Sequence, residues 1–181
     1  MLRKVLVFAL GSPVLLGLLV LLGPSGALAQ VCTTAGGYSS SFEVTGDVKQ
    51  SQTFTQATLE ALTPVTTVDD FFVTGAGTTS GQYTGVGLWD LLNAVGLKKG
   101  LNLANEYIIV TGSDCYQLVF SMAEIDPALG GTQDVIVAYD LAGAALDPTQ
   151  GFARLIIPGD KLGARRVYWI VEIQVLPGTS T

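Results

Sequence analysis

The spacing of apolar positions predicts one clear helix near the middle of the chain. Apolar residues recur at i, i+3, i+4 and i+7, at Leu88, Leu91, Leu92 and Val95. This spacing places one apolar stripe along a helix, where it can face a core. Gly96 follows directly and suits a C-cap position with a positive φ angle. We therefore expect a helix from about residue 87 to residue 95.

Most other apolar segments have the pattern of β-strands. The most regular one has apolar residues at alternate positions, Val167, Trp169, Val171, Ile173 and Val175. This alternation predicts a long strand with one apolar face. The runs 107–110 and 135–139 are apolar on both faces and fit buried strands. Shorter strands are expected at 65–73, 117–120 and 154–157, and a β-hairpin between Phe42 and Phe54 around the Gly46-Asp47 turn.

The connecting segments carry turn and capping signals. Leu59 and Leu62 favour a brief helix that Pro64 ends, and residues 75–81 read as a loop. Ser121 with Glu124 three residues later forms a capping box, and residues 140–143 have the composition of a hairpin turn. No internal repeat is present. Together these signals predict an α+β fold that contains more strand than helix.

The N-terminus has the order of a secretory signal peptide. Arg3 and Lys4 precede an apolar run, and small residues with an A-x-A cleavage site end at Ala29. We expect cleavage after Ala29 and export to the periplasm or the cell exterior. An uncleaved membrane anchor is the alternative, because the apolar run is close to the roughly 18-residue lower limit for crossing a bilayer. A lipoprotein with Cys32 as the lipidated residue is a weaker alternative.

Removal of residues 1–29 leaves 152 residues, enough for one domain with a real core. We expect a flexible segment at 30–41, the domain at 42–176 and a tail at 177–181. This mature part has 7 basic and 15 acidic residues, a net charge of -8. Nucleic acid is therefore excluded as a partner, because binding to phosphate backbones needs a basic surface.

The chain contains no histidine and two cysteines, Cys32 and Cys115. The absence of histidine removes the commonest metal ligand and the usual general base. An even cysteine count in an exported protein favours a disulfide between Cys32 and Cys115. The alternative is that Cys115 is a metal-binding or catalytic thiol, although no basic residue lies beside it in the sequence to lower its pKa.

The basic residues are concentrated near one turn. Four of the seven in the mature part, Arg154, Lys161, Arg165 and Arg166, lie within thirteen positions. Basic side chains beside a Gly-rich turn can hold a phosphate together with backbone N–H groups, so this cluster predicts a site for a small anionic ligand. The alternative is that these residues pair with nearby acids such as Asp160 and Glu172.

Several segments resemble the molybdopterin-binding domain of sulfite-oxidase-type oxidoreductases. Residues 83–92 are similar to that family's Gly-Val-Pro-Leu-x-Asp-Leu-Leu motif, with Gly87 in place of proline. Residues 112–116 resemble its Asp-Gly-Tyr turn. Residues 154–160 and 163–169 are similar to its Arg-Leu-Val-x-Pro-Gly and Gly-Ala-Arg-x-Val-Lys-Trp signatures. The resemblance covers nearly all of the mature chain and implies the family's β-rich fold.

The resemblance also implies a groove that, in enzymes of the family, holds a molybdenum-pterin cofactor. Arg165 matches a basic residue of that groove, and Tyr168 stands where lysine is expected. The resemblance places the molybdenum-ligating cysteine between residues 68 and 81, where this chain has none. Cys115 takes the glycine position of the Asp-Gly-Tyr turn instead.

The type of signal peptide bears on the same question. Exported enzymes of this family generally carry a twin-arginine signal that transports folded protein with its cofactor. Here Arg3-Lys4 and a strongly apolar segment are typical of export as an unfolded chain.

Three functions follow as hypotheses. The first is an exported, non-catalytic domain that binds a small anionic ligand or serves as a structural or partner module. The second is a molybdenum-pterin oxidoreductase with altered metal ligation. The third is a surface carbohydrate-binding or adhesion module, suggested by the content of Gly, Thr and Ser.

Overall fold

A computed structural model describes residues 32–33, 35–73, 75–98, 102–132 and 134–178, without the side chains of residues 70–73. The signal segment lies outside these residues, so cleavage after Ala29 and the expected domain limits stay predictions. None of the helices in the described ranges has the length and apolar character needed to cross a membrane.

The first sheet brings the two ends of the domain together. Its strand order is β2-β1-β10-β5-β6. β1 pairs in parallel with β10, and the other neighbours are antiparallel. The predicted hairpin before residue 55 is confirmed by the pairing of β1 with β2. The bounds are Ser41–Gly46 for β1, Gln52–Thr55 for β2, Glu106–Gly112 for β5, Gln117–Ser121 for β6 and Ile170–Pro177 for β10.

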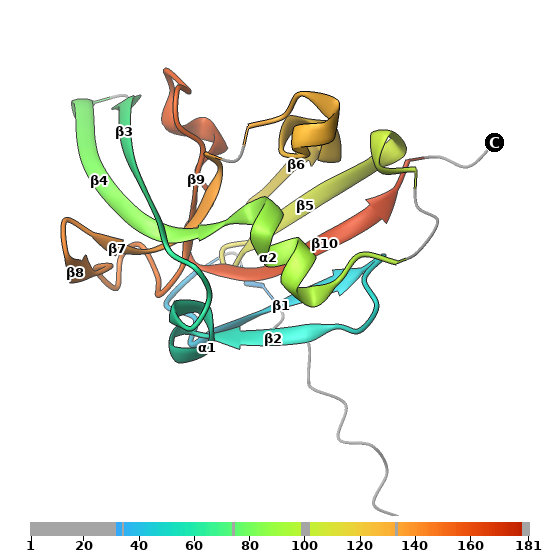
Figure 1. Cartoon of the computed structure of the whole chain (residues 1–181). Helices are drawn as coiled ribbons and strands as arrows, with labels where there is room; N and C mark the ends of the chain where they lie inside the picture. Colours follow the sequence, from blue (N-terminus) through green and yellow to red (C-terminus); the bar gives the residue numbers. More distant parts are fainter. Residues whose placement is uncertain (1–31, 34, 74, 99–101, 133, 179–181) are drawn as a thin grey trace, which may run out of the picture.

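The second sheet is antiparallel and has the order β3-β4-β7-β8, with β9 also paired to β7. Figure 1 shows β3 and β4 as a long curved pair, with α2 directly after β4 at the centre of the molecule. The predicted turn at 140–143 is confirmed, because it joins β7 to β8. The bounds are Val65–Val73 for β3, Gly77–Gly87 for β4, Ile136–Leu141 for β7, Ala144–Ala145 for β8 and Arg154–Ile156 for β9.

Two short α-helices and four single turns of 3-10 helix complete the described part of the chain. The predicted helix is confirmed as α2, Leu88–Val95, and Gly96 after it has a φ of 84°. The brief helix is α1, Gln56–Glu60. The predicted capping box is also present, because the Ser121 backbone N–H donates to Glu124 Oε1 at 3.1 Å. The 3-10 turns are η1 at Leu103–Asn105, η2 at Met122–Glu124, η3 at Pro127–Leu129 and η4 at Gly163–Arg165.

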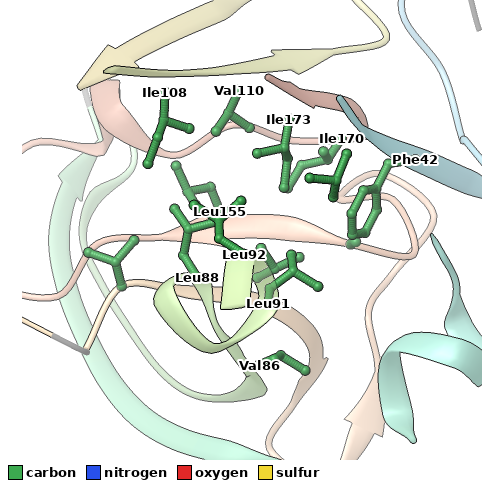
Figure 2. Close-up of a cluster of buried hydrophobic side chains, with 14 of the residues drawn as sticks. Phe42, Val86, Leu88, Leu91, Leu92, Ile108, Val110, Leu155, Ile170 and Ile173 are labelled. Atoms are coloured by element: carbon green, nitrogen blue, oxygen red, sulfur yellow. The ribbon is translucent and has the colours of Figure 1, made fainter. Parts of the chain in front are cut away.

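One large hydrophobic core joins α2 to both sheets. The four stripe residues of α2 are all buried. They pack with inward-facing residues of the first sheet and with residues of the second such as Val137. Figure 2 shows Ile108, Val110 and Ile173 of the first sheet pointing toward Leu155 of β9 and toward α2. The α+β architecture with more strand than helix is thus as predicted.

Two sequence predictions were wrong in part. Residues 77–81 belong to strand β4 and are not a loop, since β4 pairs with β3 along its length, down to Val73 opposite Gly77. The last strand begins at Ile170 and not at Val167. Trp169 has a φ of 48°, which interrupts the extended backbone, and the Val167 carbonyl accepts a hydrogen bond from Leu155 of β9. The alternation of apolar side chains in the sequence therefore begins three residues before the strand itself.

Candidate oxyanion site

Strand β9 and the segment that connects it to β10 carry the predicted basic residues to different environments. Arg154 and Arg166 are 1% and 2% exposed, Arg165 is partly exposed, and Lys161 is exposed to solvent. The sequence cluster therefore separates into two buried guanidinium groups and two groups at the surface. Their partners decide which of them is available to a ligand.

Arg166 is paired with Asp69 of β3. Its Nε and Nη2 donate to Asp69 Oδ2 and Oδ1, both at 2.5 Å, and neither side chain is exposed. Its Nη1 also donates to the Leu162 carbonyl at 2.8 Å. A bidentate arrangement of this kind satisfies both oxygens of a buried carboxylate. The pair therefore fixes η4 against β3 and cancels the charge of Arg166.

Arg165 is also paired, at the surface. Its Nε and Nη2 donate to Asp160 at 2.8 and 3.2 Å, and its Nη1 donates to Glu124 at 2.9 Å. The hydrogen bonds that Arg165 donates to Asp160 and then to Glu124 raise the pKa of Arg165 above its usual range. The alternative prediction, that the basic residues pair with nearby acids, thus holds for Arg165 and Asp160. Glu172, the other acid named, accepts a hydrogen bond from Thr45 instead.

Arg154 differs from both. It starts β9, and its Nη1 donates to Gln150 Oε1 at 2.8 Å and to Tyr83 Oη at 3.3 Å. Its Nε and Nη2 have no hydrogen-bond partner within the described part of the chain, and no carboxylate there forms an ion pair with it. Buried polar groups without partners are rare, and each one calls for an explanation, such as strain, a functional role or a bound ion or water. Arg154 is therefore a buried cation with one open edge.

Two tyrosine rings contact the Arg154 guanidinium. Its Cζ lies 4.1 Å from the ring centroid of Tyr168 and 5.2 Å from that of Tyr83. Burial raises the pKa of Tyr83, against the opposing effect of Arg154. A phenol with a raised pKa is neutral at ordinary pH. Cation–π contacts stabilise the guanidinium, but neither ring supplies the negative charge or the two acceptors that its open edge lacks.

A hollow of about 400 Å³ is lined in part by Tyr168. Asp114 and Tyr116, from the turn between β5 and β6, form one wall. The Tyr116 hydroxyl donates a hydrogen bond to the Ala164 carbonyl of η4. This bond holds the wall formed by Asp114 and Tyr116 against η4. The hollow is lined by Asp114, Tyr116, Gly163, Ala164, Arg166 and Tyr168. Its walls thus include aromatic faces, one carboxylate and the paired Arg166, and the Tyr168 ring in this lining also contacts Arg154.

The predicted disulfide is present beside this hollow. Cys32 and Cys115 are bonded, with their Cα atoms 5.0 Å apart, and Cys115 has a φ of 67°. The neighbouring segment is also held by backbone contacts, since the Thr33 N–H donates to the Ser113 carbonyl at 2.7 Å. The disulfide therefore fastens the start of the described chain to the turn that carries Asp114 and Tyr116, and leaves neither sulfur as a free thiol.

Sequence reasoning found the basic residues but missed their neighbours. Asp69, Tyr83 and Gln150 come from three separate segments, and only the fold brings them to the arginines. One signal was available for Asp69, because a carboxylate inside an apolar strand needs a cationic partner. No comparable signal marked Tyr83 or Gln150.

Comparison with protein families gives one broad match. Residues 38–181 match the family model described as the oxidoreductase molybdopterin binding domain, in agreement with the resemblance drawn from the motifs. Among curated proteins, a nitrate reductase (NADPH) from Phytophthora infestans is 36% identical over 104 residues, which are 55% of this chain and 11% of that protein. The chain thus spans about a tenth of this relative's length.

A solved structure shares the fold. The sulfane dehydrogenase SoxCD from Paracoccus pantotrophus superposes with a TM-score of 0.62 over 75% of this chain and 38% of that one, at 22% identity. At this identity the likeness establishes a common architecture and leaves ligand and activity to be argued from the residues present.

Proposed function

Because the chain belongs to the oxidoreductase molybdopterin binding domain family, we propose that it uses this fold as an exported, non-catalytic domain that binds a small ligand carrying an oxyanion group. The observation that carries the proposal is the open edge of the buried Arg154. The signal-like residues 1–29 support export.

The geometry of the three arginines indicates what Arg154 would bind. Arg165 and Arg166 both use the Nε and Nη2 edge to hold the two oxygens of a carboxylate. The same two nitrogens are the ones without partners in Arg154. A planar guanidinium edge matches groups with two acceptor oxygens, such as carboxylate, phosphate and sulfate. We therefore infer that Arg154 takes a phosphate-like group from a ligand in the hollow.

The cofactor of the family fits this site only in part. Its phosphate matches the open edge of Arg154. A thiolate ligand for molybdenum is lacking, because residues 68–81 contain no cysteine and both cysteines of the chain are paired. In the described ranges, no three His, Cys, Asp or Glu side chains are grouped so that they could hold a metal ion. The residues therefore support anion binding and do not support thiolate-held molybdenum.

Phosphate binding by an Arg154→Lys variant tests the oxyanion proposal. Lysine keeps the charge but loses the two-pronged edge, and charge-assisted hydrogen bonds contribute about 1.5–3 kcal/mol each. We expect calorimetry with inorganic phosphate and pyrophosphate to show at least about tenfold weaker binding. Arg165→Lys is the matched control, because its edge is already occupied, and its affinity should stay within about twofold. Equal losses in both variants, or no binding by the wild type, would refute the proposal.

Metal analysis tests the non-catalytic part. Protein purified from its native host should contain molybdenum at far below one atom per chain. Near-stoichiometric molybdenum would favour the alternative, an oxidoreductase with atypical ligation. Mass spectrometry of the same material should find Gln30 at the N-terminus if the export proposal is right.

A further inference from the structure

Tyr168 contacts both the Arg154 guanidinium and the hollow. Its ring faces the Arg154 guanidinium at 4.1 Å and is also part of the hollow's lining, whereas Arg154 is not. A ligand in the hollow therefore meets Tyr168 before it can reach Nε and Nη2 of Arg154. As the structure stands, Arg154 is 1% exposed, and the oxyanion site is closed.

Little holds Tyr168 in this position. Its hydroxyl makes no hydrogen bond within the described part of the chain, in contrast to that of Tyr116, which is bonded to Ala164. The ring is only half-buried, and its specific contacts are the cation–π contact with Arg154 and a tilted contact with the Trp169 ring, 6.0 Å between centroids. Such contacts contribute about 0.5–2 kcal/mol, which is less than the two charge-assisted hydrogen bonds that an oxyanion would add. An anion can therefore displace the ring at a net gain.

We propose that Tyr168 is a gate that packs against the Arg154 guanidinium and swings aside when a phosphate-like group binds to Nε and Nη2. This inference rests on the proposed oxyanion function. In the closed state the ring shields a buried cation that has no carboxylate partner among the described residues. In the open state the two oxygens of the anion replace the ring and satisfy both free nitrogens. Tyr168 thereby sets the threshold for binding, since only a group with two acceptor oxygens offsets the lost cation–π contact.

If Tyr168 is a gate, removal of its ring should strengthen the binding of phosphate. A Tyr168→Ala variant no longer has to break the cation–π contact, so its affinity for inorganic phosphate should be about 3- to 30-fold higher than that of the wild type. Tyr168→Phe is the matched control. It keeps the ring and loses only an unbonded hydroxyl, so its affinity should stay within about twofold of the wild type. Calorimetry measures all three, with circular dichroism to verify that each is folded.

A second measurement uses the wild-type protein alone. In isotope-edited NMR, nuclear Overhauser contacts between the Tyr168 ring and the Arg154 side chain should be present in the free protein and absent at saturating phosphate. Contacts that persist at saturation would overturn the gate even if the Tyr168→Ala variant did not fold.

The outcomes separate the gate from the function on which it rests. If Tyr168→Ala binds phosphate as weakly as Tyr168→Phe or more weakly, the gate is wrong and oxyanion binding stands. If neither the wild type nor either variant binds phosphate or pyrophosphate, the oxyanion function itself is wrong. Tighter binding in Tyr168→Ala, together with the loss of the Overhauser contacts, supports both.

Discussion

Asp69 and Arg166 depend on each other because both side chains are fully buried. In the bidentate contact, each group supplies the hydrogen bonds and the opposite charge that water would otherwise supply to the other. Removal of one charge would leave the second in a medium where it has no water to replace the lost partner. The pair connects β3 to the segment before β10, so its loss would also loosen one side of the hollow.

The Asp69→Asn variant tests this dependence. We expect its free energy of unfolding to fall by about 3–5 kcal/mol, the usual effect of breaking a buried ion pair. Asp160→Asn is the control, because the Asp160–Arg165 pair is partly exposed and should cost no more than about 1 kcal/mol. Urea unfolding measures both. Similar losses in the two variants would show that the burial of Asp69 is not what makes its pair important.

Glu106 is a second buried carboxyl group, at the start of β5. It is 5% exposed, and its Oε2 has no hydrogen-bond partner in the described part of the protein. Burial, and then the nearby Asp47, raise the pKa of Glu106, whereas Lys98 lowers it. The folded protein therefore holds this proton more tightly than the unfolded chain does. Stability is lost as the pH rises from the unfolded pKa, about 4.3, through the higher folded pKa.

A Glu106→Gln variant should lack this penalty. We expect the difference in unfolding free energy between variant and wild type to shift in favour of the variant as the pH rises from 4 to 7. Below the unfolded pKa the carboxyl group is protonated in both states, so no pH dependence from it remains there. Denaturant titrations at several pH values measure the difference. A difference that stays constant over this pH range would contradict the assignment.

At the scale of elements, the sequence pattern succeeded where local periodicity decides structure. Helix α2 has its stripe, its cap and its bounds within one residue of the expectation. Strand β4, Gly77–Gly87, was not predicted, and its first part, residues 77–81, was taken as a loop because Gly, Thr and Ser carry no apolar alternation. There the strand forms through backbone pairing with β3, which no pattern within the segment reveals. At Trp169 the sequence predicted a strand that is absent, because the apolar alternation includes a residue whose positive φ interrupts the extended backbone.

Gly85 shows how closely two of these strands approach. It lies in β4 at a shift in the register with β7, and a Cβ atom there would be 2.2 Å from the Val137 carbonyl oxygen and 2.5 Å from Ala138 Cα. Both are backbone atoms, so no side-chain rotation relieves the overlap. The strands have to separate to admit any side chain.

The Gly85→Ala variant is therefore expected to lose about 3 kcal/mol or more of unfolding free energy, or to fail to fold. Thr79→Ala, at an exposed position of the same strand, is the control and should change stability by no more than about 0.5 kcal/mol. Thermal unfolding followed by circular dichroism compares them. A Gly85→Ala protein with the control's stability would mean that the two strands have more room than the backbone distances allow.

At the scale of the whole molecule, the candidate site could be predicted from the sequence only as a concentration of positive charge. The four basic residues lie close together in the chain, but Asp69 is 97 positions from Arg166 and Tyr83 is 71 positions from Arg154. Which arginine is neutralised depends on these long-range contacts. The chemically informative feature, the open edge of Arg154, therefore emerges only after the two sheets are assembled.

The disulfide is the other long-range connection, and it acts mainly on the unfolded chain. Cys32 and Cys115 are separated by 83 positions. A crosslink that closes a loop of this size lowers the entropy of the unfolded state by an amount equivalent to about 4–5 kcal/mol. We expect the Cys32→Ser/Cys115→Ser variant to lose a free energy of unfolding of this order.

Reduction provides an independent control for the disulfide. Dithiothreitol should lower the unfolding midpoint of the wild type to that of the double variant and leave the variant unchanged. A count of thiols in denatured, unreduced wild-type protein should give none. Two free thiols, or equal midpoints for the unreduced wild type and the variant, would show that the disulfide does not stabilise the protein. The backbone contact between Thr33 and Ser113 would then have to hold the start of the described chain against the wall of the hollow unaided.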